Sequence, residues 1–124
     1  MANHESSENY LETILVLSRK KGNVKSIDIV HELGFSKPSV SVAMKNLKNK
    51  KLINVDVDGY ITLTQEGLDI ANRVYERHVL ISDLLIELGV SSEVAAEDAC
   101  KLEHVLSEES FQAIKNYVSN RMKR

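Results

Sequence analysis

The spacing of apolar residues along the first third of the chain predicts three helices. Between Glu8 and Lys20 apolar side chains recur with the period of an α-helix. Two shorter helices are expected after it. The first is capped by Ser26 and closed by Gly34, and the second is capped by Ser36 with Pro38 in its first turn. The short connection between these two helices is typical of a helix-turn-helix unit.

The next stretch changes from a helical period to short apolar runs. Residues 52–55 and 60–63 are expected to form a β-hairpin whose turn is supplied by Asp58-Gly59. A helix-turn-helix followed by a hairpin is the winged-helix pattern, in which the second helix enters the major groove of DNA and the hairpin touches the backbone. The sequence therefore predicts a winged helix-turn-helix domain over residues 1–63.

Helical periodicity returns for the remainder of the chain. Thr64 is expected to cap a long helix that runs to Leu88, Ser91 or Ser92 to open the next helix, and Ser107 to open the last. Residues 64–124 are therefore predicted to form an all-helical second domain, and the whole chain is mainly α. The long helix carries more apolar surface than one small domain needs, which favours a homodimer.

Charge separates the two halves, although the net charge of the 124 residues is only −2. From Phe35 to Val55 there are five lysines and no acid, whereas from Asp83 to Ser110 there are eight acids and one base. The basic stretch is a candidate for contact with phosphate and the acidic stretch for binding a cation. Either could also be an ordinary solvated surface.

The predicted second helix of the helix-turn-helix presents polar and basic side chains on its outer face. Hydroxyl, amide and ammonium groups there suit phosphate oxygens and base edges of double-stranded DNA. The DNA-binding candidates are Ser36, Lys37, Pro38, Ser39, Val42, Lys45 and Asn46. Winged helices also serve as protein-interaction modules, so the pattern indicates the fold more strongly than the function.

Three side chains that can bind a metal stand at helical spacing in the acidic stretch. Cys100, Glu103 and His104 are related as i, i+3 and i+4, which would place them along one stripe of a helix. Leu102, Leu106 and two alanines would form the apolar stripe beside it. Thiolate, carboxylate and imidazole together suit a divalent transition metal. The alternative is a solvated Glu and His beside a small buried cysteine.

Several classes of protein are disfavoured. The first residues have neither a basic start nor an apolar run, and no apolar stretch is long enough to span a bilayer, so a cytoplasmic protein without membrane contact is expected. A single cysteine cannot form an internal disulfide. An enzyme is not expected, since Cys100 and His104 as nucleophile and base would have no identifiable oxyanion hole or orienting group.

Five segments spread over almost the whole chain resemble the diphtheria-toxin-repressor family of metal-dependent transcriptional regulators, which includes the manganese-sensing MntR branch. These segments are residues 8–15, 34–44, 64–67, 75–78 and 99–107. The Cys-x-x-Glu-His motif with an upstream His in the long helix is their most specific element. The resemblance implies a metal-activated repressor of metal uptake that binds a pseudo-palindromic operator as a homodimer, with metal binding and dimerisation in the helical domain.

The resemblance also implies a set of metal ligands drawn from both domains. Carried over residue by residue, the ligands are Glu12, His78, Cys100, Glu103 and His104, with Asn9 at a further position. The set departs from the family in two places. Asn9 stands where relatives have Met or Asp, and Cys100 stands where the manganese branch has Glu. The second site of the iron branch is not expected, because Ser82 and Ala96 occupy two of its ligand positions.

Cys100 decides which metal is expected. A thiolate favours Fe(II), Co(II), Ni(II) and Zn(II) over Mn(II). Fe(II) is therefore the expected physiological metal and Mn(II) the alternative, while Co(II), Ni(II) or Zn(II) are expected to bind in vitro. A winged-helix regulator that works without metal, or in which Cys100 senses oxidation, stays open as a second hypothesis.

Overall fold

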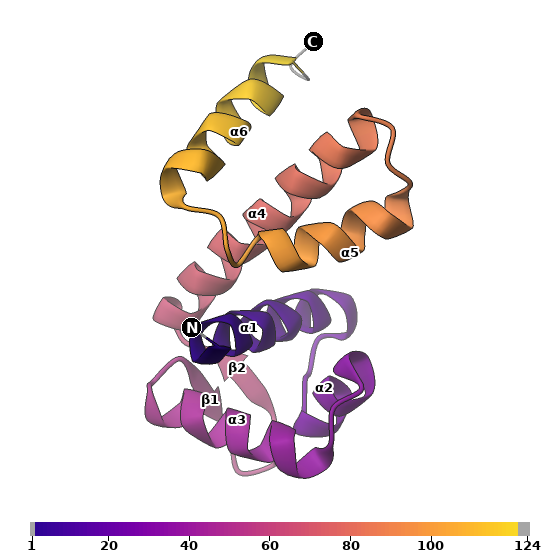
Figure 1. The fold of residues 1–124 in the computed structure, drawn as a ribbon. Helices are drawn as coiled ribbons and strands as arrows, with labels where there is room; N and C mark the ends of the chain where they lie inside the picture. The colour runs from indigo at the N-terminus through magenta and orange to yellow at the C-terminus, as the bar shows by residue number, and fades with distance from the viewer. Residues whose placement is uncertain (1, 122–124) are drawn as a thin grey trace. The chain divides into compact units, whose positions relative to one another are not determined.

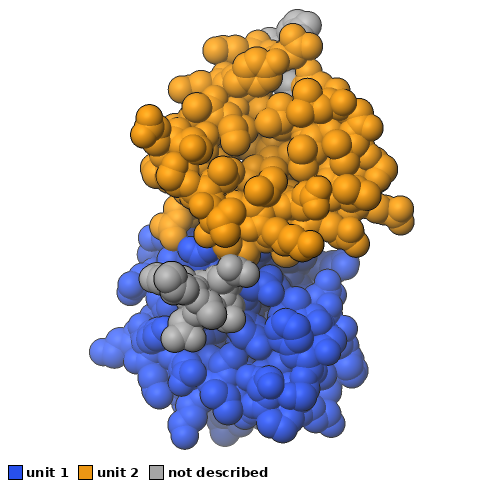
Figure 2. Space-filling view, in the orientation of Figure 1, with its two compact units in different colours: residues 1–72 blue, residues 73–124 orange. Residues whose placement is uncertain are grey.

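The computed structural model describes residues 2–121 and divides the chain into two compact units, residues 1–72 and 73–124 (Figures 1 and 2). Its elements are α1 (Ala2–Lys21), α2 (Ser26–Leu33), α3 (Lys37–Asn49), β1 (Ile53–Val55), β2 (Ile61–Leu63), α4 (Gln65–Glu87), α5 (Ser92–Leu102) and α6 (Glu108–Arg121). The mainly helical fold with a helix-turn-helix and a hairpin is as predicted. The predicted domain boundary between residues 63 and 64 stays a prediction, since α4 contributes to both units.

The helix-turn-helix of the first unit is built by local capping. The Ser36 side chain accepts a hydrogen bond from the Ser39 backbone N–H at 3.2 Å, and Gly34 takes a left-handed conformation with φ 71°. The cap of α2 differs from the prediction. Ser26 is already helical, and Asp28 accepts a hydrogen bond from the Lys25 N–H at 2.8 Å instead.

Every element of the first unit contributes apolar side chains to one core. Its buried members include Leu11 and Ile14 of α1, Ile29 of α2, Val40 and Leu47 of α3, Ile53 of β1, and Ile61 of β2. Helix α1 begins at Ala2, well before the predicted start at Glu8. Residues 3–8 are mostly polar, so the apolar period could not mark this first part of the helix.

The hairpin pairs β1 with β2 in antiparallel register, with Val55 opposite Ile61. The connection, residues 56–60, is one residue longer than the predicted 56–59, because β2 begins at Ile61. Asp56 organises it, because its Oδ1 accepts hydrogen bonds from the backbone N–H groups of Asp58 and Tyr60, each at 2.9 Å. Gly59 takes φ 89°, a conformation that favours glycine.

In the second unit α4, α5 and α6 share a separate core. Its buried members are Val74 and Ile81 of α4, Ala95 and Ala99 of α5, and Phe111 and Val118 of α6. Ion pairs that join α4 to α6 among the described residues are Glu76–Lys115 at 2.7 Å, Arg77–Glu108 at 3.0 Å and Glu87–Arg121 at 3.0 Å. Val74 and Ile81 thus belong to the core of the unit, so this part of the apolar surface of the long helix does not need a second copy of the chain to cover it. No helix among residues 2–121 is long and apolar enough to cross a membrane.

Candidate metal centre and nucleic-acid surface

The end of α5 places Glu103 inside the second unit. Ala95, Ala99 and Glu103 follow one another at intervals of four residues, so they lie on the face of α5 that is buried. Cys100 is exposed, and Leu102 is 38% exposed. The predicted arrangement of one polar stripe beside one apolar stripe is therefore wrong in detail. The helix ends at Leu102, and Glu103 continues the core-facing stripe instead of Leu102.

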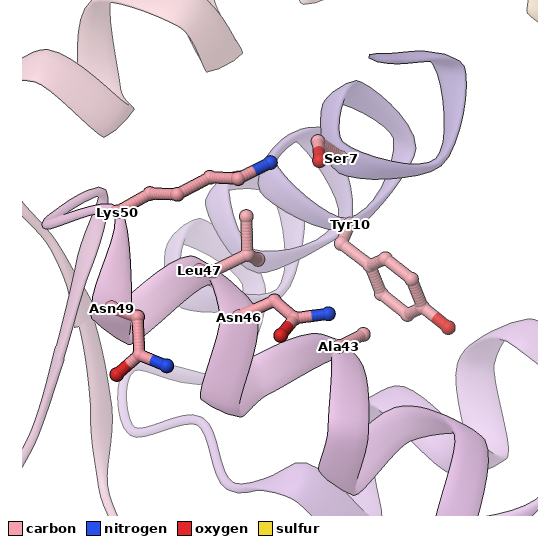
Figure 3. A pocket seen from close by; sticks show the side chains of 7 residues that line it. All are labelled: Ser7, Tyr10, Ala43, Asn46, Leu47, Asn49 and Lys50. Atoms are coloured by element: carbon pink, nitrogen blue, oxygen red, sulfur yellow. The ribbon is translucent and has the colours of Figure 1, made fainter. Parts of the chain in front are cut away.

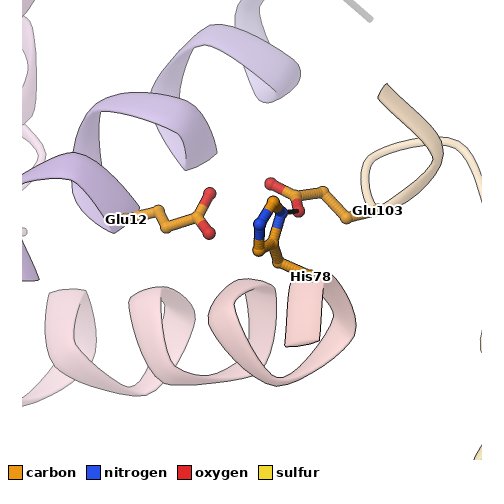
Figure 4. A group of neighbouring side chains, drawn as sticks. All are labelled: Glu12, His78 and Glu103. Atoms are coloured by element: carbon orange, nitrogen blue, oxygen red, sulfur yellow. Dashed lines mark hydrogen bonds and ion pairs between the residues drawn. The ribbon is translucent and has the colours of Figure 1, made fainter. Parts of the chain in front are cut away.

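His78 of α4 is held directly by the buried Glu103. Its Nδ1 lies 2.9 Å from Glu103 Oε1, as Figure 4 shows for these two side chains. The hydrogen bond to Glu103 favours the charged imidazolium and raises the pKa of His78 above its usual value, against the opposing effect of burial. A proton and a cation therefore compete for this pair of side chains.

The second carboxylate oxygen of Glu103, Oε2, is a buried polar atom whose hydrogen bonding is incomplete. The Glu103 side chain is completely buried, and Oε2 has no hydrogen-bond partner among the described residues. His104 Nε2 lies 3.3 Å from Oε2 without the geometry of a hydrogen bond, and its side chain is 4% exposed. A buried carboxylate oxygen without a donor is costly, and a bound cation would remove that cost. Carboxylate and imidazole are donors that fit a divalent transition metal.

The two ligand candidates of the first unit both lie on α1. Glu12 is buried, with 9% of its surface exposed. Asn9 is partly exposed, and its backbone oxygen accepts a hydrogen bond from Thr13 Oγ1 at 2.8 Å. The ligand roles of all six candidates stay predictions: Glu12, Asn9, His78, Cys100, Glu103 and His104.

Sequence reasoning assigned no role to Arg77, which contacts the connection that carries Glu103 and His104. Its Nη1 donates hydrogen bonds to the backbone oxygens of Glu103 at 3.2 Å and Leu106 at 2.8 Å. The sequence did contain a clue. Arg77 stands three residues after Val74 and four before Ile81, which is a core-facing position for a charged side chain.

The DNA-binding candidates all lie at the start or along the outer face of α3. Each of the seven predicted residues is exposed. The Ser36 hydroxyl already serves the fold, because it caps α3 and lies 2.9 Å from Ser39 Oγ. Lys37, Lys45 and Asn46 therefore carry most of the polar chemistry that this face offers to a nucleic acid.

A pocket of about 400 Å³ lies between α1 and α3 (Figure 3). It is lined by Ser7 and Tyr10 of α1 and by Ala43, Asn46, Leu47, Asn49 and Lys50 at the end of α3. One ammonium, two amides and two hydroxyls are groups that bind phosphate oxygens. Of these residues, only Asn46 was among the DNA-binding candidates drawn from the sequence, because the pairing of α1 with α3 is not visible in the sequence.

The tip of the hairpin has the opposite charge. Residues 56–60 contain Asp56, Asp58 and no lysine or arginine. Val57 is 98% exposed at the same tip. The hairpin tip therefore offers no cationic side chain for a phosphate group, in contrast to α3.

Two family models together match nearly the whole chain. Residues 4–61 match the iron dependent repressor, N-terminal DNA binding domain, and residues 64–123 match the iron dependent repressor, metal binding and dimerisation domain. The transcriptional regulator MntR of Escherichia coli O157:H7 is 36% identical over 111 residues, which cover 90% of this chain and 72% of that protein.

Solved structures agree with this match. The manganese regulator SloR superimposes with a TM-score of 0.81 at 27% identity, over 91% of this chain and 53% of that one. The T. acidophilum IdeR structure superimposes with a TM-score of 0.80 at 28% identity, over 94% of this chain and 54% of that one. The chain thus spans about half the length of these two solved chains.

Proposed function

The chain belongs to the iron-dependent repressor family, also called the diphtheria-toxin-repressor family, which includes the MntR regulators, and we propose that it is a metal-activated transcriptional repressor. In this proposal it binds double-stranded DNA as a homodimer and controls iron or manganese homeostasis in the cytoplasm. The helical domain holds the metal and the winged helix reads the operator.

One observation carries the metal part of this proposal. Glu103 is a fully buried carboxylate with one oxygen held by His78 and the other without a hydrogen-bond donor among the described residues. A purely structural carboxylate at such a position would be expected to have donors on both oxygens. His78, Glu103 and His104 would hold the cation within the second unit, and the resemblance adds Glu12, Cys100 and Asn9.

The proposed mechanism is a shift between arrangements of the two domains. When bound, the metal supplies positive charge that is shared by ligands from both domains. Glu12 of the winged-helix domain and His78 with Glu103 of the helical domain would then favour one arrangement, the one that fits the operator. Metal and operator each raise the affinity for the other by the same factor, because the coupling is reciprocal.

We propose Fe(II) as the physiological metal, with Mn(II) as the alternative. The E. coli relative is a transcriptional regulator MntR, and SloR is a manganese regulator. In this chain Cys100 replaces an oxygen ligand of the manganese branch by sulfur, which favours the metals that follow manganese in the affinity series.

Cys100→Glu is expected to raise the response to Mn(II) relative to Fe(II) and Co(II), because it exchanges a soft thiolate for a carboxylate. Cys100→Ser is the matched control, since it removes the sulfur without adding a charge. The measurement is operator affinity at fixed free concentrations of each metal under anaerobic, reducing conditions. A wild type that responds best to Mn(II), or an unchanged ranking in Cys100→Glu, would show that the thiol does not select the metal.

Recognition of DNA is proposed for the exposed face of α3, with the pocket between α1 and α3 next to it binding a backbone phosphate. Lys37 and Lys45 supply positive charge along α3, and Lys50 supplies it at the pocket. Because the hairpin tip is acidic, the contribution of the hairpin to binding is expected to be small.

Lys37→Ala is expected to weaken operator binding while metal affinity stays unchanged, since Lys37 is an exposed residue of α3 and is not one of the proposed metal ligands. The loss of one phosphate contact should lower the slope of log affinity against log salt by roughly one unit. Lys115→Ala, a lysine of α6, is the charge-matched control and should leave the slope unchanged. An unaltered salt slope in Lys37→Ala would move the contact surface away from the start of α3.

The homodimer is supported by apolar side chains that remain exposed in the second unit. They are Ile86, Leu88, Val94, Leu102, Val105 and Tyr117. One winged helix reads too few bases to be specific, so two copies on a pseudo-palindrome are expected, with half-site centres about one helical turn or a small multiple apart.

The test of the proposed function is metal-dependent DNA binding. DNA is first recovered from a random library by selection on the purified protein with Fe(II) or Mn(II). Its affinity is then measured by fluorescence anisotropy with each metal and with chelator, beside sedimentation to establish the dimer. Tight binding only with metal supports the proposal. Equal binding in chelator that changes when Cys100 is oxidised would favour the thiol-sensing alternative.

A further inference from the structure

Arg77 is a buried cation on the same helix as His78. Its side chain is only 11% exposed, and it projects from α4 between the buried positions Val74 and Ile81. Burying a guanidinium is costly unless acceptors surround it, and the contacts of Arg77 are therefore informative. Its Nε, which is buried, has no hydrogen-bond partner among the described residues. The hydrogen bonds of the guanidinium are made by its terminal nitrogens, Nη1 and Nη2.

The first of these nitrogens holds the segment that bears the proposed ligands. Nη1 donates to the backbone oxygens of Glu103 and Leu106, which lie on either side of His104. These carbonyls follow the end of α5 at Leu102, where the helix no longer supplies partners of its own. Arg77 thereby fixes the path of the chain from Glu103 to Leu106.

Two consecutive residues of α4 consequently contact Glu103, one at its carboxylate and the other at its backbone oxygen. His78 holds its carboxylate through Oε1 at 2.9 Å, and Arg77 holds its backbone oxygen at 3.2 Å. With the backbone fixed on one side and the side chain on the other, Oε2 is aimed at a defined point. Groups behind the direct ligands commonly set metal affinity in this way.

The other side of the guanidinium reaches α6. Nη2 lies 3.0 Å from Glu108 Oε1, and the guanidinium carbon lies 5.0 Å from the centre of the Phe111 ring. Phe111 is one of the buried core residues of α6. One side chain therefore joins α4, the 103–106 connection and α6.

We propose that Arg77 is a positioning residue for the metal centre and links the occupancy of that centre to the stability of α6. This inference rests on the proposed function, because it concerns the metal bound at Glu103. A bound metal would restrict the motion of the Glu103 backbone. Because Arg77 contacts that backbone as well as Glu108 and Phe111, the restriction would extend to α6, which would then unfold locally less often. The link is reciprocal, so loosening α6 lowers metal affinity by the same factor.

The deciding variant is Arg77→Lys, which keeps the positive charge but cannot hold two carbonyls and a carboxylate at once. Arg121→Lys is the matched control, because Arg121 also pairs α6 with α4, through Glu87 at 3.0 Å, away from the 103–106 connection. Mn(II) and Co(II) affinities are measured by calorimetry at a temperature where every variant is folded, with the Co(II) absorption spectrum recorded. Hydrogen exchange of the α6 amides is followed with and without metal.

In Arg77→Lys the metal affinity should fall by about 10- to 100-fold. The Co(II) spectrum should shift, and the gain in α6 protection on adding metal should disappear, whereas Arg121→Lys should keep all three properties of the wild type. A residue that only stabilised the fold would lower the melting temperature and leave the spectrum unchanged. If Arg77→Lys does not fold, Glu108→Gln takes its place, with loss of the metal-dependent α6 protection as the expected result.

The outcomes separate the two proposals. A wild type that binds neither Mn(II) nor Co(II) overturns the proposed function and this inference with it. A wild type that binds metal, together with an Arg77→Lys or Glu108→Gln variant of unchanged affinity, spectrum and α6 protection, overturns the inference alone.

Discussion

Replacing Glu103 by glutamine is expected to abolish metal-dependent operator binding while leaving the metal-free protein at least as stable as the wild type. The two effects have one cause. Glu103 Oε2 is a buried carboxylate oxygen without a hydrogen-bond donor among the described residues, so its charge costs free energy until a cation binds. Glutamine keeps the shape and the acceptor for His78, removes the charge, and provides a poor metal ligand.

The expected magnitudes are large enough to be decisive. Metal affinity should fall by more than about a hundredfold, since groups behind the ligands alone are worth about 10- to 100-fold. The unfolding free energy of the metal-free protein should rise by about 1 kcal/mol, the lower end of the cost of an unsatisfied buried group. Both are measured on one preparation, by metal titration and by urea unfolding in chelator.

Glu97→Gln is the control for this prediction, because Glu97 is an exposed acid of α5, the helix that ends just before Glu103. It should change neither metal affinity nor stability beyond about 0.5 kcal/mol. A Glu103→Gln variant that loses stability in chelator but keeps its response to metal would make Glu103 a structural carboxylate. The metal would then have to be bound elsewhere.

Gly67→Ala is expected to destabilise the winged-helix unit by at least about 2–3 kcal/mol, the upper part of the range for overpacking a core. In an ordinary helix the same change would stabilise, because alanine is the better helix former. Here a Cβ on Gly67 would overlap the backbone carbonyl of Leu52, which is itself held by the Thr64 N–H at 3.0 Å. Because the Cβ would meet backbone atoms, no flexible side chain can move to relieve the overlap.

Urea unfolding followed by circular dichroism measures this prediction, with operator binding as a second readout. Glu66→Ala, at the exposed neighbouring position, should stay within about 0.5 kcal/mol of the wild type. A Gly67→Ala variant as stable as the wild type would show that α4 can move away from Leu52 at little cost.

The sequence by itself determined the features that depend on neighbouring residues along the chain, which are the helix caps and the order of the elements. Ser36 caps α3, Thr64 accepts from the Gly67 N–H, and Ser91 caps α5, all as the local pattern predicted. Gly34 closes α2 in a left-handed conformation for the same reason. The order of elements followed from these caps and from the helical period, and with it the winged-helix fold.

The candidate site was predicted less evenly. Helical spacing identified Cys100, Glu103 and His104 as candidate ligands, but it placed all three along one stripe of a helix. Only the packing of α5 decided that Glu103 lies buried in the core while Cys100 lies in solvent. A helical period fixes which residues share a face, whereas the neighbouring helices decide which face is covered.

Tertiary structure alone decided the contacts between distant segments. The approach of Gly67 to the backbone of Leu52 makes glycine a requirement of the fold at a helix position where alanine is otherwise the better helix former. The contacts of Arg77 with Glu103, Leu106 and Glu108 join residues 26 to 31 positions apart. Such contacts depend on side-chain reach and on backbone distances in three dimensions, which a one-dimensional pattern does not contain.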